Sequence, residues 1–292
     1  MKRIAILGAG MSGLILCEAL EQNNKDIKID IYTKDILGQQ KYSFDLGPRI
    51  LHSTEKVDKF IKNFLGETNK RKYKIGYLID KNLVDECEKE NVKKYAEKCG
   101  KMLSESTMSC GKNEITGYDI RGLQIAEKLA EKHKDKITVC TVDKALLKRL
   151  KDDYDKIYST IPLGVLQEIL GYQNSTLVSS SIFVLSKEEY KYNPYDYVYD
   201  LSDDNAVKRV SNFKGKSVYE LVGTYKDIVE EALKISDSVG IEEMHIVKST
   251  IVMNFPLRHF AGIELVGRFA TNNHSERLDT IIEKYLRWEN GR

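Results

Sequence analysis

The first twenty residues of this 292-residue chain constrain its fold more than any other stretch. A short apolar run leads directly into three spaced glycines, and an amphipathic pattern follows: Ile4–Leu7, then Gly8, Gly10 and Gly13, then 14–20. A strand that ends in such a turn and continues into a helix is typical of a dinucleotide-binding unit. The pattern therefore predicts an α/β fold with a parallel sheet.

Each glycine of this turn has a physical role in binding a dinucleotide. Gly8 permits the tight turn, Gly10 lets a pyrophosphate approach the backbone, and Gly13 lets the helix pack close to the strand. The N-terminus of the helix, at Met11 and Ser12, offers backbone N–H groups to the phosphates. A tight turn between a strand and a helix without any ligand is the alternative.

Composition limits the class of protein. The chain is 41% hydrophobic and 31% charged, which suffices for one large core or two small ones. No apolar run approaches the ~20 residues that a membrane span needs, and a net charge of +2 argues against a broad nucleic-acid surface. The five cysteines include no Cys-x-x-Cys pair, so we predict reduced thiols, no metal site and a cytoplasmic protein.

The end of the second expected strand, 27–32, bears on the choice of cofactor. A dinucleotide-binding unit usually ends this strand with an acid that holds the ribose hydroxyls. The expected position is Tyr32, with Thr33 or Asp35 as possible substitutes. Lys34 is either simply solvated or placed to meet a 2′-phosphate, which would favour NADP.

Two segments after this strand resemble a known superfamily. Leu37-Gly38-Gln39-Gln40 comes first, and 45–53 follows with the sequence Asp-Leu-Gly-Pro-Arg-Ile-Leu-His-Ser. They resemble the flavoproteins that include amine oxidases and UDP-galactopyranose mutases, which carry a Gly-Gly turn and then a Gly-Pro/Gly-His-Ile-Phe-His-Thr segment. This chain keeps Gly47, Pro48, Ile50 and His52, and has Arg49 in place of the first histidine.

Later segments match the same superfamily in the same order. A helix from 119 to 132 is followed by a short strand at 137–140 and by 155–162, which is similar to the family's Tyr-Asp-x-Val-Ile-x-Thr-x-Pro segment. Near the C-terminus, 262–271 resembles the mutases' Gly-Arg-Leu-Ala-Thr segment, which precedes a helix aimed at the flavin. Here we expect that helix from about Ser275. These matches cover about half of the chain.

The resemblance implies non-covalent FAD and a set of site residues. The negative charge of the reduced flavin would be stabilised by a helix N-terminus and by Arg268, unless this arginine is a structural ion-pair partner. The predicted cofactor-binding residues are Gly8, Gly10, Met11, Ser12, Gly13, Thr33, Gly38, Gly47, Pro48, Thr160, Pro162, Gly267, Arg268 and Ser275. The predicted catalytic residues are Arg49, His52, Arg268 and His274, where either histidine serves as acid or base or is merely structural.

The chain also departs from the mutases. Asn272, Asn273 and His274 stand where the mutases have tyrosines and an arginine that bind the substrate diphosphate, so UDP-galactose is a weaker candidate substrate. The chain is shorter than those enzymes, and the shortening falls in the substrate domain. The basic run Lys70–Lys74 is either a solvated loop or a site for a phosphorylated substrate or a nucleic acid.

An unusual run of tyrosines lies in the region expected to hold the substrate. Tyr195, Tyr197 and Tyr199 alternate, which predicts that they share one face of a strand. The next expected strand, 206–213, contains Arg209. The predicted substrate contacts are these tyrosines, Arg209 and Asn272; ordinary sheet packing is the alternative, because aromatic residues favour strands.

Together these patterns predict a Rossmann-type FAD domain with a smaller inserted α+β substrate domain. The FAD domain comprises 1–65, 119–170 and 255–292, and the substrate domain comprises 66–118 and 171–254. The leading function is oxidation of a C–N or C–OH bond in a small or nucleotide-linked substrate, by hydride transfer to flavin N5. The alternatives are a mutase-like redox-neutral isomerase, an enzyme that modifies nucleotides or DNA bases, and a non-catalytic nucleotide-binding module. The sequence leaves the oligomeric state open.

Overall fold

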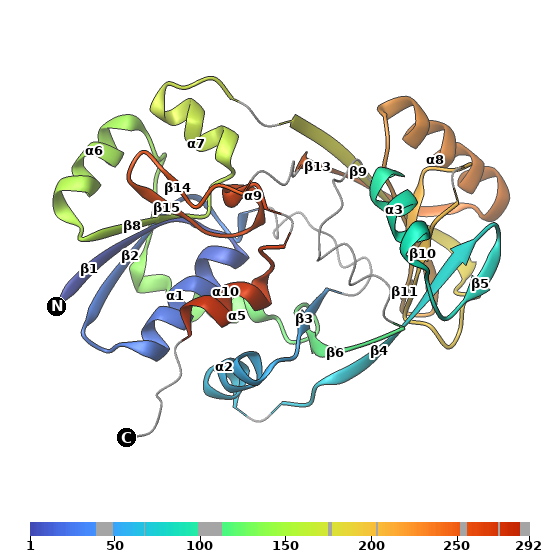
Figure 1. Cartoon of the computed structure of the whole chain (residues 1–292), viewed down its shortest axis with the longest axis horizontal. Helices are drawn as coiled ribbons and strands as arrows, with labels where there is room; N and C mark the ends of the chain where they lie inside the picture. The colour runs from blue at the N-terminus through green and yellow to red at the C-terminus, as the bar shows by residue number, and fades with distance from the viewer. Residues whose placement is uncertain are drawn as a thin grey trace.

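The chain forms two sheets that lie side by side (Figure 1). The computed structural model describes residues 1–38, 49–66, 68–98, 113–174, 177–202, 204–251, 256–273 and 275–286, and the structure below is that of these residues. The first sheet has six strands in the order β14 (His259–Phe260), β15 (Ile263–Leu265), β8 (Lys156–Ser159), β1 (Lys2–Ala9), β2 (Ile27–Ile36) and β7 (Ile137–Val139). All neighbours are parallel except β14 and β15.

The second sheet has nine strands, mostly antiparallel. Its order is β13 (Ile241–Ile251), β9 (Leu177–Glu189), β12 (Lys216–Leu221), β11 (Val207–Phe213), β10 (Tyr197–Asp200), β4 (Arg71–Ile79), β6 (Glu114–Asp119) and β3 (Ile50–His52), with β5 (Asn82–Val84) beside β4. Thus β3 pairs with β6 of this sheet, although the helix that follows it packs on the first sheet.

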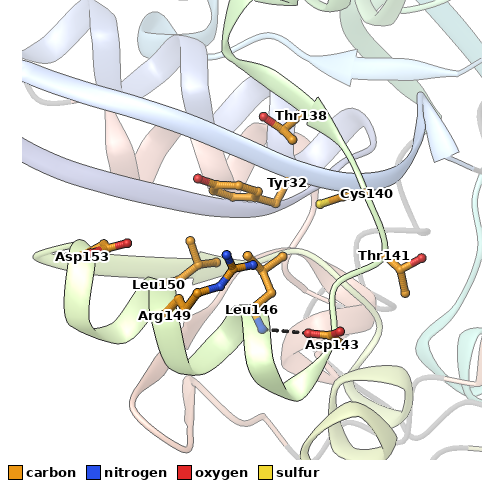
Figure 2. A pocket seen from close by; sticks show the side chains of 9 residues that line it. All are labelled: Tyr32, Thr138, Cys140, Thr141, Asp143, Leu146, Arg149, Leu150 and Asp153. Carbon is orange, nitrogen blue, oxygen red and sulfur yellow. Dashed lines mark hydrogen bonds between the residues drawn. The ribbon is translucent and has the colours of Figure 1, made fainter.

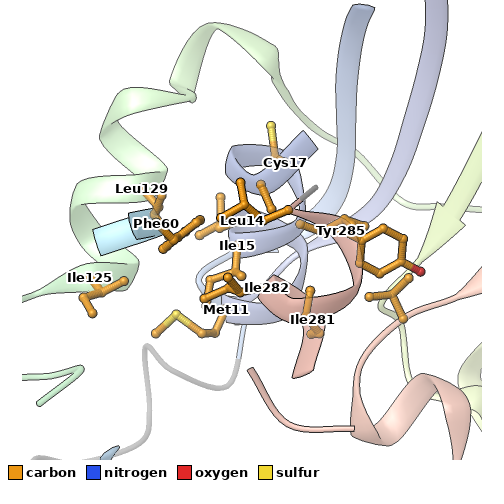
Figure 3. Close-up of a cluster of buried hydrophobic side chains, with 14 of the residues drawn as sticks. Met11, Leu14, Ile15, Cys17, Phe60, Ile125, Leu129, Ile281, Ile282 and Tyr285 are labelled. Carbon is orange, nitrogen blue, oxygen red and sulfur yellow. The ribbon is translucent and has the colours of Figure 1, made fainter. Parts of the chain in front are cut away.

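Helices cover both faces of the six-stranded sheet. On one face lie α1 (Met11–Asn23), α2 (Glu55–Leu65), α5 (Ile125–Lys132) and α10 (Leu278–Tyr285), and on the other lie α6 (Lys144–Asp153) and α7 (Leu163–Leu170). The alternation of β1 explains this arrangement, since Ile4 and Ile6 point to the first face and Ala5 and Leu7 to the second. Figure 3 shows the first of these cores, in which Leu14 and Ile15 of α1 meet Ile281 and Ile282 of α10.

The nine-stranded sheet has its own core. The helix α8 (Tyr225–Val239) begins at Thr224, which forms a capping box with Asp227, and it packs Ile228 and Ile235 against β9, β11 and β12. Figure 1 shows α8 on the side of this sheet that is turned away from the six-stranded sheet. Near the other edge, α3 (Lys89–Lys98) packs Tyr95 against Tyr77 and Tyr197.

The fold class is confirmed, and three expected bounds shift. The strand β2 runs on to Ile36, because the pairing with β1 resumes at Ala9 and Ile36 after an irregularity in the register. The C-terminal helix begins at Leu278 rather than near Ser275, since Asn273 and Ser275 form a turn in which Asn273 Oδ1 accepts from the Ser275 N–H. The expected helix after residue 119 begins only at Ile125, preceded by turns.

Candidate functional site

The turn between β1 and α1 is held tightly by its neighbours. Gly8 has a φ of +102°, and a Cβ on it would lie 2.6 Å from Thr160 Oγ1. That hydroxyl donates to the carbonyl of Leu7 at 3.0 Å. A Cβ on Gly13 would lie only 2.0 Å from the Gly8 carbonyl oxygen, so α1 contacts the strand end as closely as the glycine pattern predicted.

Gly10 is different, because a Cβ there would meet no atom within 4 Å. It is the N-cap of α1, and this helix has neither a side-chain cap nor an acid in its first turn. Open space beside uncapped N–H groups suits an anion at the helix N-terminus. The turn therefore fits the pyrophosphate of a dinucleotide such as FAD.

Two further segments from distant parts of the chain reach this turn. A Cβ on Gly38 would lie 3.9 Å from Gly10 Cα, and the Leu37 N–H donates to the Ala9 carbonyl at 2.9 Å. A Cβ on Gly267 would lie 2.7 Å from Ser12 Oγ. Gly267 caps the short helix α9 (Arg268–Thr271), so the C-terminal motif and the N-terminal glycine turn are neighbours.

The expected ribose-binding position at Tyr32 is wrong. Its hydroxyl lies 2.8 Å from that of Tyr154, which in turn donates to Asp30, so the side chain faces α6 rather than α1. Thr33 points to the opposite face, as alternation along the strand requires. Its hydroxyl donates to the Asp35 carbonyl at 2.7 Å within a local turn, and its role toward FAD stays a prediction.

A cavity of about 310 Å³ lies beneath this strand end on the side of α6. Figure 2 shows Tyr32 and Cys140 above it and the side chains of α6 below. It lies on the face of the sheet opposite α1, so it is no extension of the glycine turn. Its lining residues are Tyr32, Thr138, Cys140, Thr141, Asp143, Leu146, Arg149, Leu150 and Asp153.

The other predicted cofactor-binding residues that the structure describes lie in the core or in turns at helix ends. The Met11 side chain is buried in the core between α1 and α10, which leaves only its backbone for a ligand. Pro162 is the N-cap of α7, directly after Thr160 and Ile161. Ser275 lies in the turn before α10. Gly47, Pro48 and His274 lie outside the described residues.

Arginines from both halves of the chain gather where the two sheets face each other. Arg49, just before β3, lies near Arg121, Arg209 and Arg268, close enough for their charges to act on its pKa. Burial is the largest cause and lowers the pKa of Arg49 to about 10, Glu220 opposes this, and the three other arginines add to it. Burial and Arg277 likewise lower the pKa of Arg268. The two predicted catalytic arginines are thus neighbours; their roles stay predictions.

The nine-stranded sheet supplies one row of this cluster. Tyr199, Arg209, Glu220 and Phe183 are register partners on β10, β11, β12 and β9. They alternate with the residues that pack under α8, so the row lies on the opposite face of the sheet. The guanidinium carbon of Arg49 lies 5.7 Å from the centre of the Phe183 ring.

Glu220 and Arg121 belong to the cluster although the sequence analysis did not predict them as site residues. Glu220 is buried and lies 2.6 Å from Lys208 and 2.9 Å from Arg209. Burial opposes its ionisation, but these cations hold its pKa well below the usual range. A carboxylate in an alternating apolar strand was the available signal, since such a residue needs a partner cation.

The three tyrosines do not share one face. The strand β10 begins only at Tyr197, and Tyr195 lies in the preceding turn, where its hydroxyl donates to Asp85 and its ring packs with Leu78 and Val198. The prediction that Tyr195 shares a strand face with the other two is therefore wrong, whereas its role toward substrate stays a prediction. Tyr197 and Tyr199 do lie together, with ring centres 5.4 Å apart, and the Arg209 guanidinium lies 5.3 Å from the Tyr197 ring centre.

The remaining predicted residues lie around the cluster. His52 is half-buried on β3 and pairs in register with Gly117. Asn272 ends α9 in a left-handed conformation. The roles of both toward substrate stay predictions.

The basic run 70–74 is not an excess of free charge. Lys70 pairs with Asp58, Arg71 with Asp196, Lys72 with Glu114 and Lys74 with Asp85. Each of its four cations thus has a carboxylate partner at the surface, which reduces the potential available to a polyanion. A nucleic-acid partner here stays a prediction.

A second group of titratable residues lies far from the arginines. Cys17 and Glu21 of α1 and His133 after α5 place ligand atoms within 4.8 Å of one another. Lys136 Nζ already lies 2.9 Å from Glu21 and 3.2 Å from His133 Nδ1. Two of the three possible ligand residues therefore already contact an ammonium group.

Comparisons with known proteins were made by sequence and by structure. No family model and no curated protein matches the sequence. A reduced UDP-galactopyranose mutase has 12% identity and a TM-score of 0.59, covering 98% of this chain and 94% of that chain. The L-proline dehydrogenase from P. horikoshii has 11% identity and a TM-score of 0.61, covering 98% and 92%. A putative FAD-containing monooxygenase from Photorhabdus luminescens has 11% identity and a TM-score of 0.51, covering 98% and 86%.

These matches extend over almost the whole chain, at an identity that reports on fold alone. The chain shares the fold of these proteins, one of which is a putative FAD-containing monooxygenase, and the fold class that the sequence motifs predicted is confirmed. Among the described residues, no helix has both the length and the apolar character to cross a bilayer.

Proposed function

We propose that the chain is an FAD-dependent enzyme that oxidises a C–N or C–OH bond of its substrate. The observation that carries the proposal is the meeting of four distant segments at the carboxyl end of β1. The glycine turn of β1, Gly38, Thr160 and Gly267 are brought together around an open, uncapped helix N-terminus. Ligands of open parallel sheets bind outside the carboxyl ends of the strands.

The chain's own residues would bind and orient FAD. The N–H groups of α1 beside Gly10 would bind the pyrophosphate, and Thr160 holds the turn in shape through its hydrogen bond to Leu7. Arg268 begins the segment next to Ser12 and provides a half-buried cation beside the site. FAD held there would supply N5 as the acceptor for a hydride from the substrate carbon, and the amine or hydroxyl proton would leave to a base or to solvent.

The mutase-like alternative rests on the match to the UDP-galactopyranose mutase over 94% of that chain. Both activities use the same cofactor, and they differ in the redox state that each requires. An oxidase or dehydrogenase reacts from the oxidised flavin, whereas a redox-neutral isomerase requires reduced flavin and returns it unchanged.

The first test is the absorbance spectrum of the purified or FAD-reconstituted protein, followed by chromatography of the nucleotide released on denaturation. We expect the visible bands of oxidised flavin and recovery of FAD. Recovery of NADP, or of no nucleotide after reconstitution, would overturn the proposal.

The second test mixes the oxidised protein anaerobically with amines, amino acids, hydroxy acids and nucleotide sugars. We expect one class of substrate to bleach the flavin without added reductant. Turnover only after reduction by dithionite, with the flavin still reduced at the end, would replace the oxidoreductase with the isomerase. Flavin binding without any turnover would favour a non-catalytic module.

A further inference from the structure

Two arginines near the proposed flavin site have no evident role in binding a dinucleotide. Arg49 and Arg209 belong to the nine-stranded half of the cluster, whereas Arg268 adjoins the glycine turn. We propose that Arg49 and Arg209 together bind an anionic group of the substrate, a carboxylate or a phosphate. The proposal rests on the proposed function for the identity of the ligand as a substrate.

Among the residues that the structure describes, Arg49 is a half-buried cation without a carboxylate partner. Within the described part of the chain, no acidic oxygen lies within ion-pairing distance of its guanidinium, and its contact is the ring of Phe183. An aromatic face supports a guanidinium from one side and leaves its N–H edge available to another group. Glu220 is the carboxylate that acts on Arg49 from beyond ion-pairing distance, and three arginines oppose it. A desolvated arginine in such surroundings is stabilised when an anion joins it.

Arg209 is similarly incomplete. Its side chain is only 14% exposed, and Nη2 lies 2.9 Å from Glu220. Its Nε is buried and has no hydrogen-bond partner among the described residues. Buried donors are normally satisfied, so this unpaired N–H indicates a group that the protein alone does not provide.

The balance of charge favours an anion. Glu220 is the carboxylate of the row, and it is shared between Arg209 and Lys208. Arg49 adds a cation on which the charges of Arg121, Arg209 and Arg268 act, and Asp279 in turn acts on Arg268. Around half-buried side chains, several neighbouring cations attract a negative group more strongly than they would at an open surface.

The geometry also limits the chemistry of that group. Guanidinium forks bind planar carboxylates and tetrahedral phosphates through two parallel N–H bonds. Tyr197 and Tyr199 lie next to Arg209 in the same row and provide aromatic surface for the rest of the molecule. Carboxylate and phosphate share this recognition, so the experiment must separate them.

The test is calorimetric titration of the FAD-loaded protein with sodium phosphate, sodium pyrophosphate and sodium acetate, each at constant ionic strength set with chloride. We expect saturable binding of at least one of these probes, together with a change in the flavin absorbance. Tighter phosphate or pyrophosphate binding identifies a phosphorylated substrate, and tighter acetate binding identifies a carboxylic acid. Absence of saturable binding by all three would overturn the proposal.

Variants locate the binding. Arg49→Gln and Arg209→Gln should each weaken the bound probe at least tenfold, and Arg49→Lys should recover part of the loss. If Arg209→Gln fails to fold because Glu220 loses its partner, the pair Arg209→Gln/Glu220→Gln replaces it. Arg149→Gln is the matched control, because Arg149 is exposed on α6 beside the separate cavity. Equal binding by Arg49→Gln and by the control would overturn the proposal.

The design separates this proposal from the proposed function. Flavin content is measured on the same samples, and anion binding is measured by heat rather than by turnover. Anion binding at Arg49 without any substrate oxidation would overturn the oxidoreductase and leave the anion site. Substrate oxidation together with anion binding that Arg49→Gln does not change would overturn the anion site and leave the oxidoreductase.

Discussion

At the scale of single residues, chemically identical glycines have different roles. Gly13 is packed against the Gly8 carbonyl, whereas Gly10 faces open space at the start of α1. The first position is therefore restricted by the protein itself. The second is restricted only if a ligand occupies that space.

The variants Gly10→Val and Gly13→Val separate these two roles. Gly10→Val should leave the unfolding free energy of the apoprotein almost unchanged but abolish FAD binding, because the side chain would occupy the place of the pyrophosphate. Gly13→Val should cost about 3 kcal/mol or more, since the strand and helix must move apart. Urea unfolding of the apoproteins and FAD titration measure both effects. Normal FAD affinity in Gly10→Val would contradict the assignment of the turn.

Arg268 offers a second prediction at this scale. Its guanidinium has no carboxylate within ion-pairing distance among the described residues, so a purely structural ion pair does not explain it. Arg268→Ala should lower the flavin reduction potential by about 30 mV, which is ~1.4 kcal/mol for two electrons, because a cation that favours the reduced anion is lost. The potential is measured by equilibration with reference dyes. An unchanged potential together with a large loss of folding stability would mark a structural residue instead.

At the scale of elements, one buried carboxylate of α1 accepts hydrogen bonds from the C-terminal end of α5. Glu18 is 1% exposed and accepts hydrogen bonds from Gln22, Lys132 and His133 at 2.8, 2.7 and 2.9 Å. Burial alone would raise its pKa. The hydrogen bonds outweigh burial and hold the pKa at about 2, below the ordinary value of 4.5.

This shift gives stability a defined dependence on pH. The folded pKa of Glu18 is depressed, so its contribution is complete above about pH 5 and is lost as pH falls toward 2. A shift from 4.5 to about 2 corresponds to about 3 kcal/mol. Glu18→Gln should therefore flatten the loss of unfolding free energy over this range, measured by urea unfolding at each pH. Glu131→Gln, which removes an exposed ion pair with Lys134, is the control and should leave this pH dependence unchanged.

At the scale of the whole molecule, the proposed cofactor would connect segments that are far apart in the chain. The glycine turn, Gly38, Thr160 and Gly267 meet at one end of the six-stranded sheet, and the arginines of the second sheet face the same region. A ligand that binds only this assembled arrangement stabilises the folded state by mass action.

FAD at one hundred times its dissociation constant should add about 2.7 kcal/mol. For a chain of this length, that corresponds to a rise in Tm of roughly 5–10 °C. Thermal unfolding with increasing FAD measures it, and Gly10→Val should show no rise. An equal rise with NADP would contradict the assignment of FAD.

The sequence by itself determined the elements whose signals are local. The glycine turn, the helix after it and the order of the flavoprotein motifs depend on neighbouring residues and backbone sterics, so the α/β fold followed from them. The prediction that Tyr32 faces the ribose failed because it depended on which face of a strand each residue takes. The shared face predicted for Tyr195 failed because its strand starts two residues later.

Only the tertiary structure decided which distant residues meet. Arg49 and Arg268 are 219 positions apart, and no local pattern indicates that they approach Arg209 and Glu220. Their meeting follows from strand register, which aligns Tyr199, Arg209, Glu220 and Phe183 across four strands. Register is set by the packing of whole faces against α8 and the first sheet, and a shift of one residue would turn every side chain of the row to the other face.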